Sequence, residues 1–314
     1  MNLLVIGGTG YIGSFVVREF SRDERIDKVI VLSRKFAPFL KECGEKVVHI
    51  PADIADPSSL QKALSSLSLD VAFHLATASG RDMRELLRVN VGGTLNVMEA
   101  LKEADLDLFI FASTAANLYG NAVYRPIDEK HPLRPISPYG LSKQMAEAAV
   151  SYFVEHYGFP AAIFRQTNVY GWAPVMKYTI VNAFIRDAAS KGEVTIVGTG
   201  EQQRNFLHMT DLFRYYEAAV FHPNKNKLKG EILNVAGPET VTVKRVAELL
   251  KEIMREKYGI DIKITYKAPS GKRAEVYDFP ISWEKASQLL GVEPKIHLKQ
   301  GIEMELDRVL KSSS

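Results

Sequence analysis

Two side chains able to carry out acid–base chemistry, Tyr139 and Lys143, stand four residues apart near the middle of the chain. Pro138 suits the first position of a helix and Ser137 suits its N-cap, so both side chains are predicted to share one helix face. A phenol with a pKa of about 10 is a poor base at neutral pH, but a neighbouring ammonium stabilises the phenolate and lowers that pKa. The pair could therefore serve as a general acid and base, although the same spacing also occurs by chance on solvated helices.

A glycine-rich turn near the start of the chain has the features of a phosphate-binding loop. Residues 2–6 form a continuous apolar stretch typical of a buried parallel strand, and an amphipathic helix is predicted at 11–21. Between them, Gly7, Gly10 and Gly13 are spaced three residues apart. Glycines let the backbone turn tightly and approach a pyrophosphate, whose charge is stabilised by free N–H groups at the helix N-terminus. The sequence therefore predicts a dinucleotide-binding loop.

The end of the second predicted strand, at 28–32, bears on the choice of dinucleotide. An acidic residue at this place would bind the ribose 2′-hydroxyl of NAD. The chain instead has Ser33, Arg34 and Lys35. A hydroxyl and two cations suit a 2′-phosphate, so NADP is slightly favoured. NAD stays open, because the two cations could also be solvated loop residues.

The remaining elements alternate regularly along the first half of the chain. Further strands are predicted at 47–50, 70–76, 106–111 and 160–164, and helices at 58–65, 81–103 and 138–157. This alternation predicts an α/β fold with a doubly wound parallel Rossmann sheet, which binds ligands at the carboxyl ends of its strands. Asp53 follows the third strand, where a carboxylate could bind an adenine amino group. His74, in the fourth strand, is expected to pack rather than to catalyse.

Composition and charge exclude several other classes of protein. The chain has 314 residues, 46% of them hydrophobic, and its net charge of +3 is the balance of 40 basic and 37 acidic residues. So small a charge gives no support for binding to nucleic acids or membrane surfaces. Cys43 is the only cysteine, so no internal disulfide can form, and neither a leader peptide nor a long apolar span is recognised. A soluble cytoplasmic protein without a metal site is expected.

Taken together, these features resemble the extended short-chain dehydrogenases/reductases of the NAD-dependent epimerase/dehydratase family, whose best known members act on nucleotide sugars. The resemblance covers nearly all of the chain and depends on several motifs that occur in the family's order. They are Gly7-Gly8-Thr9-Gly10-Tyr11-Ile12-Gly13, Asp53-Ile54, His74-Leu75-Ala76, Asn90-Val91, Ser113-Thr114-Ala115-Ala116, Tyr139 with Lys143, and Asn168-Val169-Tyr170-Gly171.

The resemblance implies three catalytic residues. Tyr139 would be the acid and base, and Lys143 would bind the nicotinamide ribose while lowering the pKa of the tyrosine. A Ser or Thr at the end of the fifth strand would hydrogen-bond the same substrate hydroxyl. Counting forward from that strand gives Thr114, whereas counting back from Tyr119 gives an alanine. Thr114 is therefore expected, with Ser113 as the alternative.

The resemblance also implies binding residues. Those for the cofactor are Gly7, Gly10, Tyr11, Ile12, Gly13, Ser33, Arg34, Lys35, Asp53, Ile54, Leu75, Ala76, Thr77, Asn90, Tyr139, Lys143 and Gln166. Those for the substrate are Thr114, Asn168, Asn182, Arg204 and Arg273. Arg204 would clamp a sugar diphosphate, since a guanidinium fork matches phosphate oxygens. Trp172 could either stack on a ligand or pack in the core.

The reaction is inferred partly by exclusion. Sugar 4,6-dehydratases of this family carry an Asp-Glu pair directly after the catalytic Thr, and decarboxylases also tend to hold an acid in this region. Here Ala115 and Ala116 stand there. The expected function is therefore a nucleotide-sugar epimerase of the UDP-galactose/UDP-glucose type, which oxidises and re-reduces a sugar hydroxyl at C4. The alternatives are an NADPH-dependent reductase of a keto nucleotide sugar and a non-catalytic dinucleotide-sensing protein.

Residues 1–170, with returning segments from about 200–240, are expected to form the dinucleotide-binding domain, and 171–314 mainly a substrate-binding lobe. In that lobe, helices are predicted at 178–190, 241–257, 282–290 and 298–311, and strands at 194–197 and 262–266. The resemblance implies a homodimer paired through the helices at 81–103 and 138–157. A UDP-sugar is the expected partner, with no nucleic acid or membrane.

Overall fold

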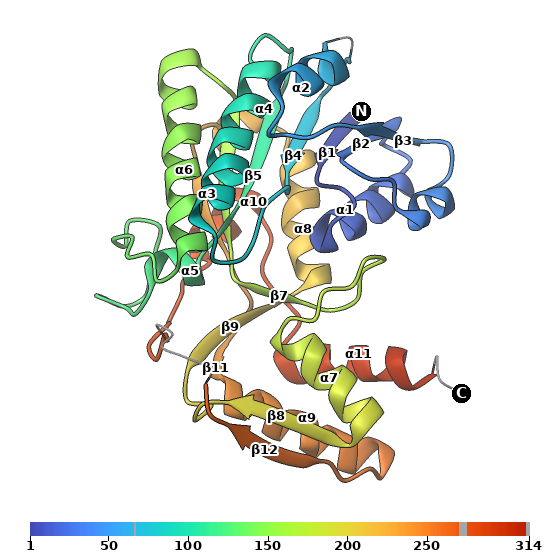
Figure 1. The fold of residues 1–314 in the computed structure, drawn as a ribbon, viewed down its shortest axis with the longest axis vertical. Helices are drawn as coiled ribbons and strands as arrows, with labels where there is room; N and C mark the ends of the chain where they lie inside the picture. Colours follow the sequence, from blue (N-terminus) through green and yellow to red (C-terminus); the bar gives the residue numbers. More distant parts are fainter. Residues whose placement is uncertain (66, 270–274, 312–314) are drawn as a thin grey trace.

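The computed structural model describes residues 1–65, 67–269 and 275–311, which form two lobes (Figure 1). The larger lobe is built on a seven-stranded sheet in the order β10-β6-β5-β4-β1-β2-β3, with every neighbouring pair parallel. Its strands are β1 (Asn2–Ile6), β2 (Lys28–Ser33), β3 (Val47–Pro51), β4 (Val71–His74), β5 (Leu108–Thr114), β6 (Ala161–Gln166) and β10 (Ile232–Val235). The doubly wound parallel sheet predicted from the sequence is confirmed.

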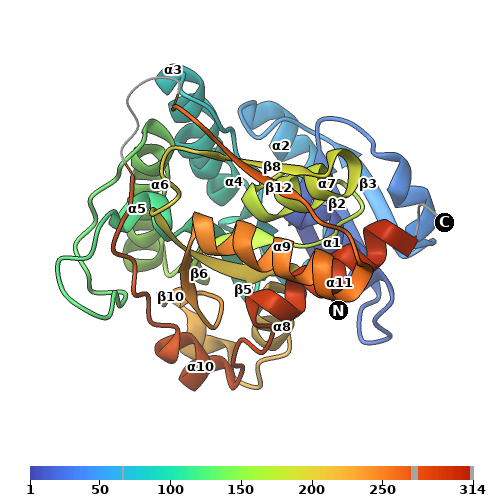
Figure 2. The same cartoon turned by 90° about the horizontal axis from the view of Figure 1, so that it is seen from below.

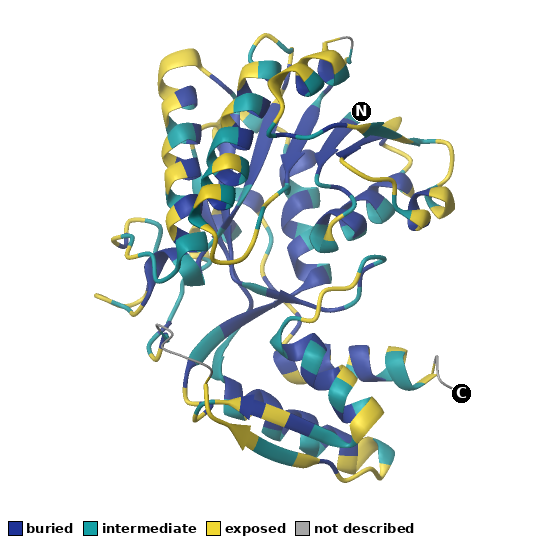
Figure 3. Cartoon of the chain, viewed as in Figure 1, coloured by how far each residue is buried: buried dark blue, intermediate teal, exposed yellow. Residues whose placement is uncertain are grey.

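Helices cover both faces of this sheet, because successive residues of a strand point to opposite sides. They are α1 (Tyr11–Ser21) and α8 (Met209–Val220) on one face, and α2 (Pro57–Leu64), α4 (Gly93–Leu101) and α6 (Pro138–Tyr157) on the other. Leu3 and Val5 of β1 join the first cluster, whereas Leu4 and Ile6 join the second. The strands are consequently buried along most of their length (Figure 3).

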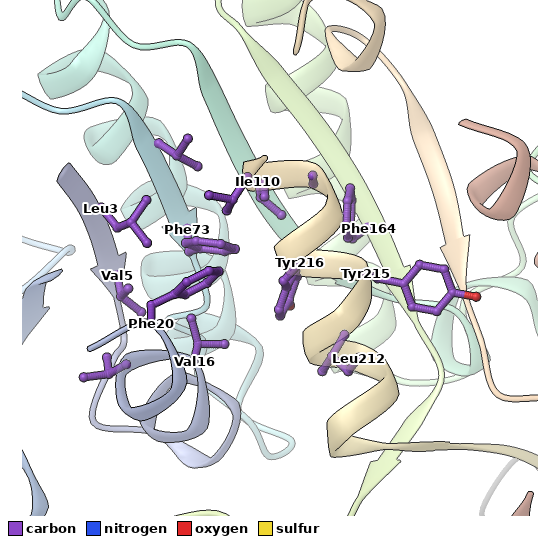
Figure 4. Packing of buried hydrophobic residues seen from close by; sticks show 14 of the residues in the cluster. Leu3, Val5, Val16, Phe20, Phe73, Ile110, Phe164, Leu212, Tyr215 and Tyr216 are labelled. Atoms are coloured by element: carbon purple, nitrogen blue, oxygen red, sulfur yellow. The ribbon is translucent and has the colours of Figure 1, made fainter. Parts of the chain in front are cut away.

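Aromatic side chains fill the space between the sheet and helices α1 and α8 (Figure 4). The ring centroids of Phe20 and Phe73 lie 5.8 Å apart, and those of Phe73 and Tyr216 lie 5.2 Å apart. Phe164 of β6 stacks on Tyr216 from the other side, at 5.8 Å. Rings of this size bury large apolar areas, so this cluster binds α1 and α8 to the centre of the sheet.

Helix α6 begins and ends where the sequence predicts. Ser137 accepts a hydrogen bond from the backbone N–H of Gly140 at 3.0 Å, which caps the first turn. Gly158 follows the last turn in the left-handed conformation that favours glycine. These local signals hold the start of the helix, and with it Tyr139, at the carboxyl edge of the sheet.

The helix predicted at 81–103 is present over 83–101, with a change of helix type inside it. The structure has a short helix, α3 (Met83–Leu86), then a π-helical turn at Leu87–Gly92, and then α4. Gly93 lies against Ile54, and a Cβ on Gly93 would come within 2.7 Å of the Ile54 side chain. The expectation of a bend or close packing at the glycine pair is therefore confirmed.

The elements of the larger lobe that were not predicted from the sequence include one strand and one long helix. Strand β10 pairs with β6 as the edge strand of the sheet, and α8 packs on the face that α1 also covers. Both lie in the region where the chain returns from the smaller lobe (Figure 1). Their place is set by contacts with residues far away in sequence.

The smaller lobe lies at the carboxyl edge of the sheet and surrounds its own core (Figures 1 and 2). Its elements are β7 (Asn168–Tyr170), β9 (Gln203–His208) and β11 (Thr240–Thr242) in one sheet, the parallel pair β8 (Glu193–Val197) and β12 (Lys263–Lys267), and helices α7 (Ile180–Lys191), α9 (Val243–Tyr258) and α11 (Leu298–Lys311). Two further helices are short: α5 (Ala116–Tyr119) directly follows β5, and α10 (Glu284–Leu290) directly precedes α11.

Trp172 contacts elements of both lobes. The guanidinium groups of Arg18 in α1 and Arg308 in α11 lie 4.4 Å and 4.8 Å from the centroid of its ring. Such cation–π contacts fix the ring between the two helices.

In the part of the chain that the structure describes, no helix combines the length and apolar character needed to cross a bilayer.

Candidate active site

The glycine-rich loop has the shape that a bound pyrophosphate requires. Gly7 has a φ of +83°, and a Cβ there would lie 2.6 Å from the backbone nitrogen of Ala76. A Cβ on Gly13 would overlap the carbonyl oxygen of Gly7. Only glycine fits these two positions, so the loop packs against the end of β4 and leaves the N-terminus of α1 bare of side-chain caps. The residues present fit a dinucleotide.

The hydroxyl predicted to bind a 2′ group already has partners. Ser33 is buried, and its Oγ donates to the carbonyl of Lys35 at 3.0 Å and lies 2.9 Å from His49 Nε2. Since the hydroxyl proton is used, the imidazole N–H donates to Ser33. Arg34 and Lys35 are exposed beside it. The contact with His49 was missed, because the two residues meet only through the pairing of β2 with β3.

Asn90 connects the loop after β4 to the helix that carries Tyr139. Its Oδ1 accepts from the N–H of Ala78 at 2.7 Å and from the hydroxyl of Thr77 at 3.0 Å. Its Nδ2 donates to Ala78 O at 3.1 Å and to Ser142 Oγ on α6 at 2.9 Å. The structure thus gives Asn90 a supporting position, and direct contact with a cofactor stays a prediction.

Tyr139 lines a cavity of about 200 Å³ between the lobes. The lining residues come from both lobes: Tyr11, Ile12, Ser113, Tyr139, Gln166, Thr167, Asn168, Val169, Lys177, Thr179, Ile180 and Phe206. Burial raises the pKa of the Tyr139 hydroxyl, and the polar side chain of Thr77 opposes this in part. The net shift is upward because the phenolate would lose its hydration, and the lowering of this pKa by Lys143 stays a prediction.

Lys143 is only 2% exposed, and its Nζ lies 4.0 Å from the centroid of the Phe111 ring. Burial lowers the pKa of Lys143 to about 7, and the carboxylate of Glu147 opposes this effect. His74 is buried nearby, and its Nε2 lies 3.0 Å from Thr94 Oγ1. Burial, with a smaller contribution from Lys143, lowers the pKa of His74 to about 3, so it is neutral. His74 packs, as predicted.

The structure distinguishes the two candidates for the third catalytic residue by position. Ser113 lines the cavity, and its buried Oγ has no hydrogen-bond partner. Thr114, at the end of β5, is partly exposed and accepts a long hydrogen bond of 3.4 Å from Asn117 Nδ2. Ser113, the alternative, thus shares the lining of this cavity with Tyr139, whereas Thr114 is not among its described lining residues. The assignment itself stays a prediction.

Other hydroxyls of the cavity are also free to bind a ligand. The Oγ1 atoms of Thr167 and Thr179 are buried and have no partner. Asn168 Nδ2 donates to the carbonyl of Asn205 at 3.2 Å, and the Gln166 amide donates to the hydroxyl of Tyr216. Buried polar atoms normally find partners, so unpaired hydroxyls in one cavity favour a ligand rich in hydroxyl groups.

Two predicted binding residues contact each other. Tyr11, expected to bind cofactor, donates to the carbonyl of Gly171 at 2.6 Å and accepts from Asn182 Nδ2 at 3.0 Å. Asn182 Oδ1 accepts from the N–H of Gly171 at 2.9 Å, and its Nδ2 is 2.9 Å from Lys177 O. The Asn182 amide therefore joins the lobes, and the phosphate contact predicted for it stays a prediction.

Arg204 lies beside a larger cavity in the smaller lobe. Its Nη2 is 2.9 Å from Glu275 Oε2, and its Nη1 donates to the carbonyl of Gln203 at 2.7 Å. Glu275 also lines a cavity of about 740 Å³, together with Tyr266 and Tyr277. Arg273 lies outside the described residues.

Lys177 and Thr179 are cavity residues that sequence reasoning missed. Lys177 precedes the helix predicted at 178–190 and Thr179 falls in its first turn, and neither belongs to a motif that the sequence analysis singled out. Among the residues that the structure describes, no group of three or more His, Cys, Asp or Glu side chains is arranged to hold a metal ion.

A doubly wound sheet, a glycine loop shaped for a pyrophosphate and a Tyr–Lys pair at the carboxyl edge define a dinucleotide-binding enzyme class. The model of the NAD dependent epimerase/dehydratase family matches residues 3–236. The chain belongs to this family.

Three comparisons place the chain within the family. It is 30% identical over 310 residues to a Methanocaldococcus jannaschii protein provisionally named a UDP-glucose 4-epimerase, with 96% of each chain covered. It is similar in structure to a UDP-glucose 4-epimerase of Thermotoga maritima solved with UDP-glucose, with a TM-score of 0.87, 29% identity and full coverage of both chains. It also resembles a UDP-glucuronic acid 4-epimerase of Bacillus cereus in complex with UDP-glucuronic acid and NAD, with a TM-score of 0.85, 26% identity, and 99% and 100% of the two chains covered.

Proposed function

We propose that this protein is a nucleotide-sugar epimerase that inverts C4 of a UDP-sugar, with Tyr139 as the acid and base. One observation carries the proposal: Tyr139 is in the cavity wall, and no carboxylate is among the described lining residues. Elimination of water or carbon dioxide would call for further acid–base groups, and the two residues after Thr114 are alanines. Removal and return of one proton needs only the tyrosine.

The cofactor would be held by the glycine loop and by Lys143. The cradle formed by Gly7 and Gly13 fits a pyrophosphate, and the ammonium of Lys143 would hydrogen-bond the ribose hydroxyls. When bound, the nicotinamide supplies the acceptor and donor for the hydrogen on C4. NAD is favoured by the family and by the Bacillus cereus relative, whereas the preference for NADP argued from Arg34 and Lys35 stays a prediction.

The residues of this chain would move one proton at a fixed oxygen. Tyr139 would take the proton of the C4 hydroxyl as that carbon is oxidised, and give it back after the sugar has turned. Because burial raises the pKa of Tyr139, the phenolate needs the charge of Lys143 nearby to form near neutral pH. Ser113 or Thr114 would hydrogen-bond the same sugar oxygen.

The smaller lobe would bind the nucleotide. Its cavity of about 740 Å³ lies within the size range of ligand sites, and Tyr266 and Tyr277 offer faces for a base. Arg204 would bind the diphosphate in exchange for part of its contact with Glu275. Asn168 would contact the substrate from the cavity between the lobes.

Replacement of Tyr139 by Phe tests the mechanism. Tyr139→Phe should lower kcat with UDP-glucose or UDP-galactose by at least about 100-fold, because the group that transfers the proton is gone. Tyr152→Phe is the matched control, since Tyr152 is exposed on the same helix. Turnover of Tyr139→Phe close to that of the wild type would exclude the proposed role.

A keto-sugar reductase is the second candidate, favoured by the exposed Arg34 and Lys35 beside Ser33. A reductase consumes NADPH in stoichiometric amount, whereas an epimerase returns to the sugar the hydride that it has taken from it. Absorbance of the reduced nicotinamide, followed during turnover, separates the two.

The cytoplasmic location expected from the sequence stays a prediction.

A further inference from the structure

A buried ion pair lies one helical turn beyond Lys143. Glu147 of α6 and Arg165 of β6 are 4% and 3% exposed. Arg165 Nε is 3.1 Å from both carboxylate oxygens of Glu147, and Nη2 is 2.7 Å from Oε2. Glu147 therefore faces Arg165 on one side and is one turn from Lys143 along the helix.

Arg165 is itself held in place by neutral groups. Its Nη1 donates to the hydroxyl of Tyr119 at 2.7 Å and to the carbonyl of Glu129 at 3.2 Å. The Tyr119 hydroxyl donates in turn to Asn234 Oδ1 at 2.8 Å. This network leaves the guanidinium little freedom, so the carboxylate of Glu147 has a fixed position.

The ion pair is not explained by stability alone. Buried charges lose their hydration, and a well-packed apolar pair of similar size often stabilises a protein as much or more. Glu147 stands one helical turn after Lys143 on α6, and Arg165 of β6 pairs with its carboxylate. A role for this pair in the charge of the neighbouring lysine would account for its position.

The surroundings of Lys143 leave Glu147 as its source of negative charge. On α6, Tyr139 stands one turn before it and Glu147 one turn after it. From β4 it faces His74, which is neutral, and from β5 it faces the ring of Phe111. Arg165 on β6 is the cation that pairs with this carboxylate. Among the described residues, the Lys143 ammonium has no hydrogen-bond partner.

We propose that Glu147, held by Arg165, is a positioning residue that keeps the buried ammonium of Lys143 charged for cofactor binding. It acts through Lys143 and does not touch the reacting atoms. The inference goes beyond the proposed epimerase function, since it applies to any reaction that uses this lysine to bind the cofactor.

The direction of the effect follows from the charges. Burial lowers the pKa of Lys143 to about 7, and Glu147 opposes that shift. Without the carboxylate, Lys143 loses its proton at a lower pH. A neutral amine holds ribose hydroxyls less firmly than an ammonium does, so the affinity for NAD should fall at a lower pH as well.

The experiment is a titration of the full-length chain, freed of copurified nucleotide, with NAD by calorimetry from about pH 6 to about pH 9. In the wild type, the affinity should fall as pH rises through about 7. In Glu147→Gln, the midpoint of that fall should be lower by about one pH unit or more, so that NAD binds up to about tenfold more weakly near pH 7. Glu147→Asp, which keeps the charge, should restore most of the wild-type midpoint.

Two further variants keep the test decisive. Glu147→Gln leaves a buried guanidinium unpaired, so the double variant with Arg165→Gln removes both charges and keeps a hydrogen-bonding pair; its midpoint should shift in the same direction. Glu155→Gln, exposed on the same helix, should bind NAD as the wild type does. A wild-type midpoint in the folded double variant, or a wild-type affinity independent of pH, would overturn the proposal. No sugar is used, so failure of the epimerase assignment would leave this result intact.

Discussion

Burial changes the acid–base properties of Tyr139, Lys143 and His74. His74 and Lys143 are both buried, and burial disfavours the charged form of each, so both pKa values lie below their ordinary ranges. Phenols respond in the opposite direction, and the pKa of Tyr139 is raised. The Tyr139–Lys143 pair thus consists of groups whose charged forms need support from a ligand or from neighbouring residues.

At the same scale, His74 should weaken the protein toward acid. Its folded pKa of about 3 is lower than its ordinary value of 6.5, so the unfolded chain binds a proton first as pH falls between these values. The contribution of the neutral, buried His74 to the free energy of unfolding is therefore fully present above about pH 6.5. It is lost on acidification, by up to about 1.4 kcal/mol per pH unit. His74→Gln should make this loss shallower by that amount between about pH 6 and pH 5.

Urea unfolding at the two pH values measures the difference between the variants. His156→Gln is the control, because it replaces an exposed histidine on α6 and should leave the acid dependence unchanged. Asn90→Asp would be unsuitable, because it adds a titratable group. Equal acid dependence in the wild type and in His74→Gln would show that His74 is not the group responsible.

At the scale of the element, the start of α6 controls the site. Ser137 Oγ accepts from the N–H of Gly140 and donates to Asn117 Oδ1, both at 3.0 Å. The bond to Asn117 connects the helix that carries Tyr139 to α5, which follows β5. A cap therefore positions the tyrosine against the strand end that carries Ser113 and Thr114.

Ser137→Ala should lower the free energy of unfolding by about 1 kcal/mol, the usual cost of a lost N-cap. Because the first turn of α6 would fray beside Tyr139, kcat should fall more than KM rises. Ser151→Ala, in the interior of the same helix, is the control and should lower neither the free energy of unfolding nor kcat. Thermal unfolding and steady-state kinetics of the two variants give the comparison; a stable Ser137→Ala with full activity would contradict this role.

At the scale of the whole molecule, α4 and α6 leave an apolar surface uncovered. Leu95 on α4 and Leu141, Met145 and Tyr152 on α6 are exposed, and the three on α6 follow a helical spacing of about four and seven residues. Exposed apolar stripes on neighbouring helices mark association surfaces. We propose that two copies of the chain pair through these helices, as the family resemblance implies.

Met145→Lys should weaken such a dimer, because a charge would be buried at the centre of the paired surface. Light scattering after size exclusion should show the wild type at twice the chain mass and the variant shifted toward the monomer. Met304→Lys, which changes an exposed methionine on α11, should remain a dimer. A wild type that runs as a monomer would remove the proposal.

Local chemistry made much of this molecule readable from the sequence. The bounds of α1, α6 and α11 agree with the predicted ones, because caps, glycines and apolar periodicity are encoded within each segment. The glycine loop and the Tyr139–Lys143 pair were found for the same reason, since short spacing on a strand end or a helix face fixes their geometry. Elements α8 and β10 were missed, because their positions depend on distant strands and helices.

Only the tertiary structure decided what each of these residues experiences. It joined Tyr11 to Asn182, Ser33 to His49, and Glu147 to Arg165, pairs that no local spacing announces. It also buried the Tyr139 hydroxyl, which raises the pKa of that group because hydration is lost on folding. Residue types and their spacing therefore determined which chemistry is available, whereas burial and contacts between distant segments decided how charge is placed to use it.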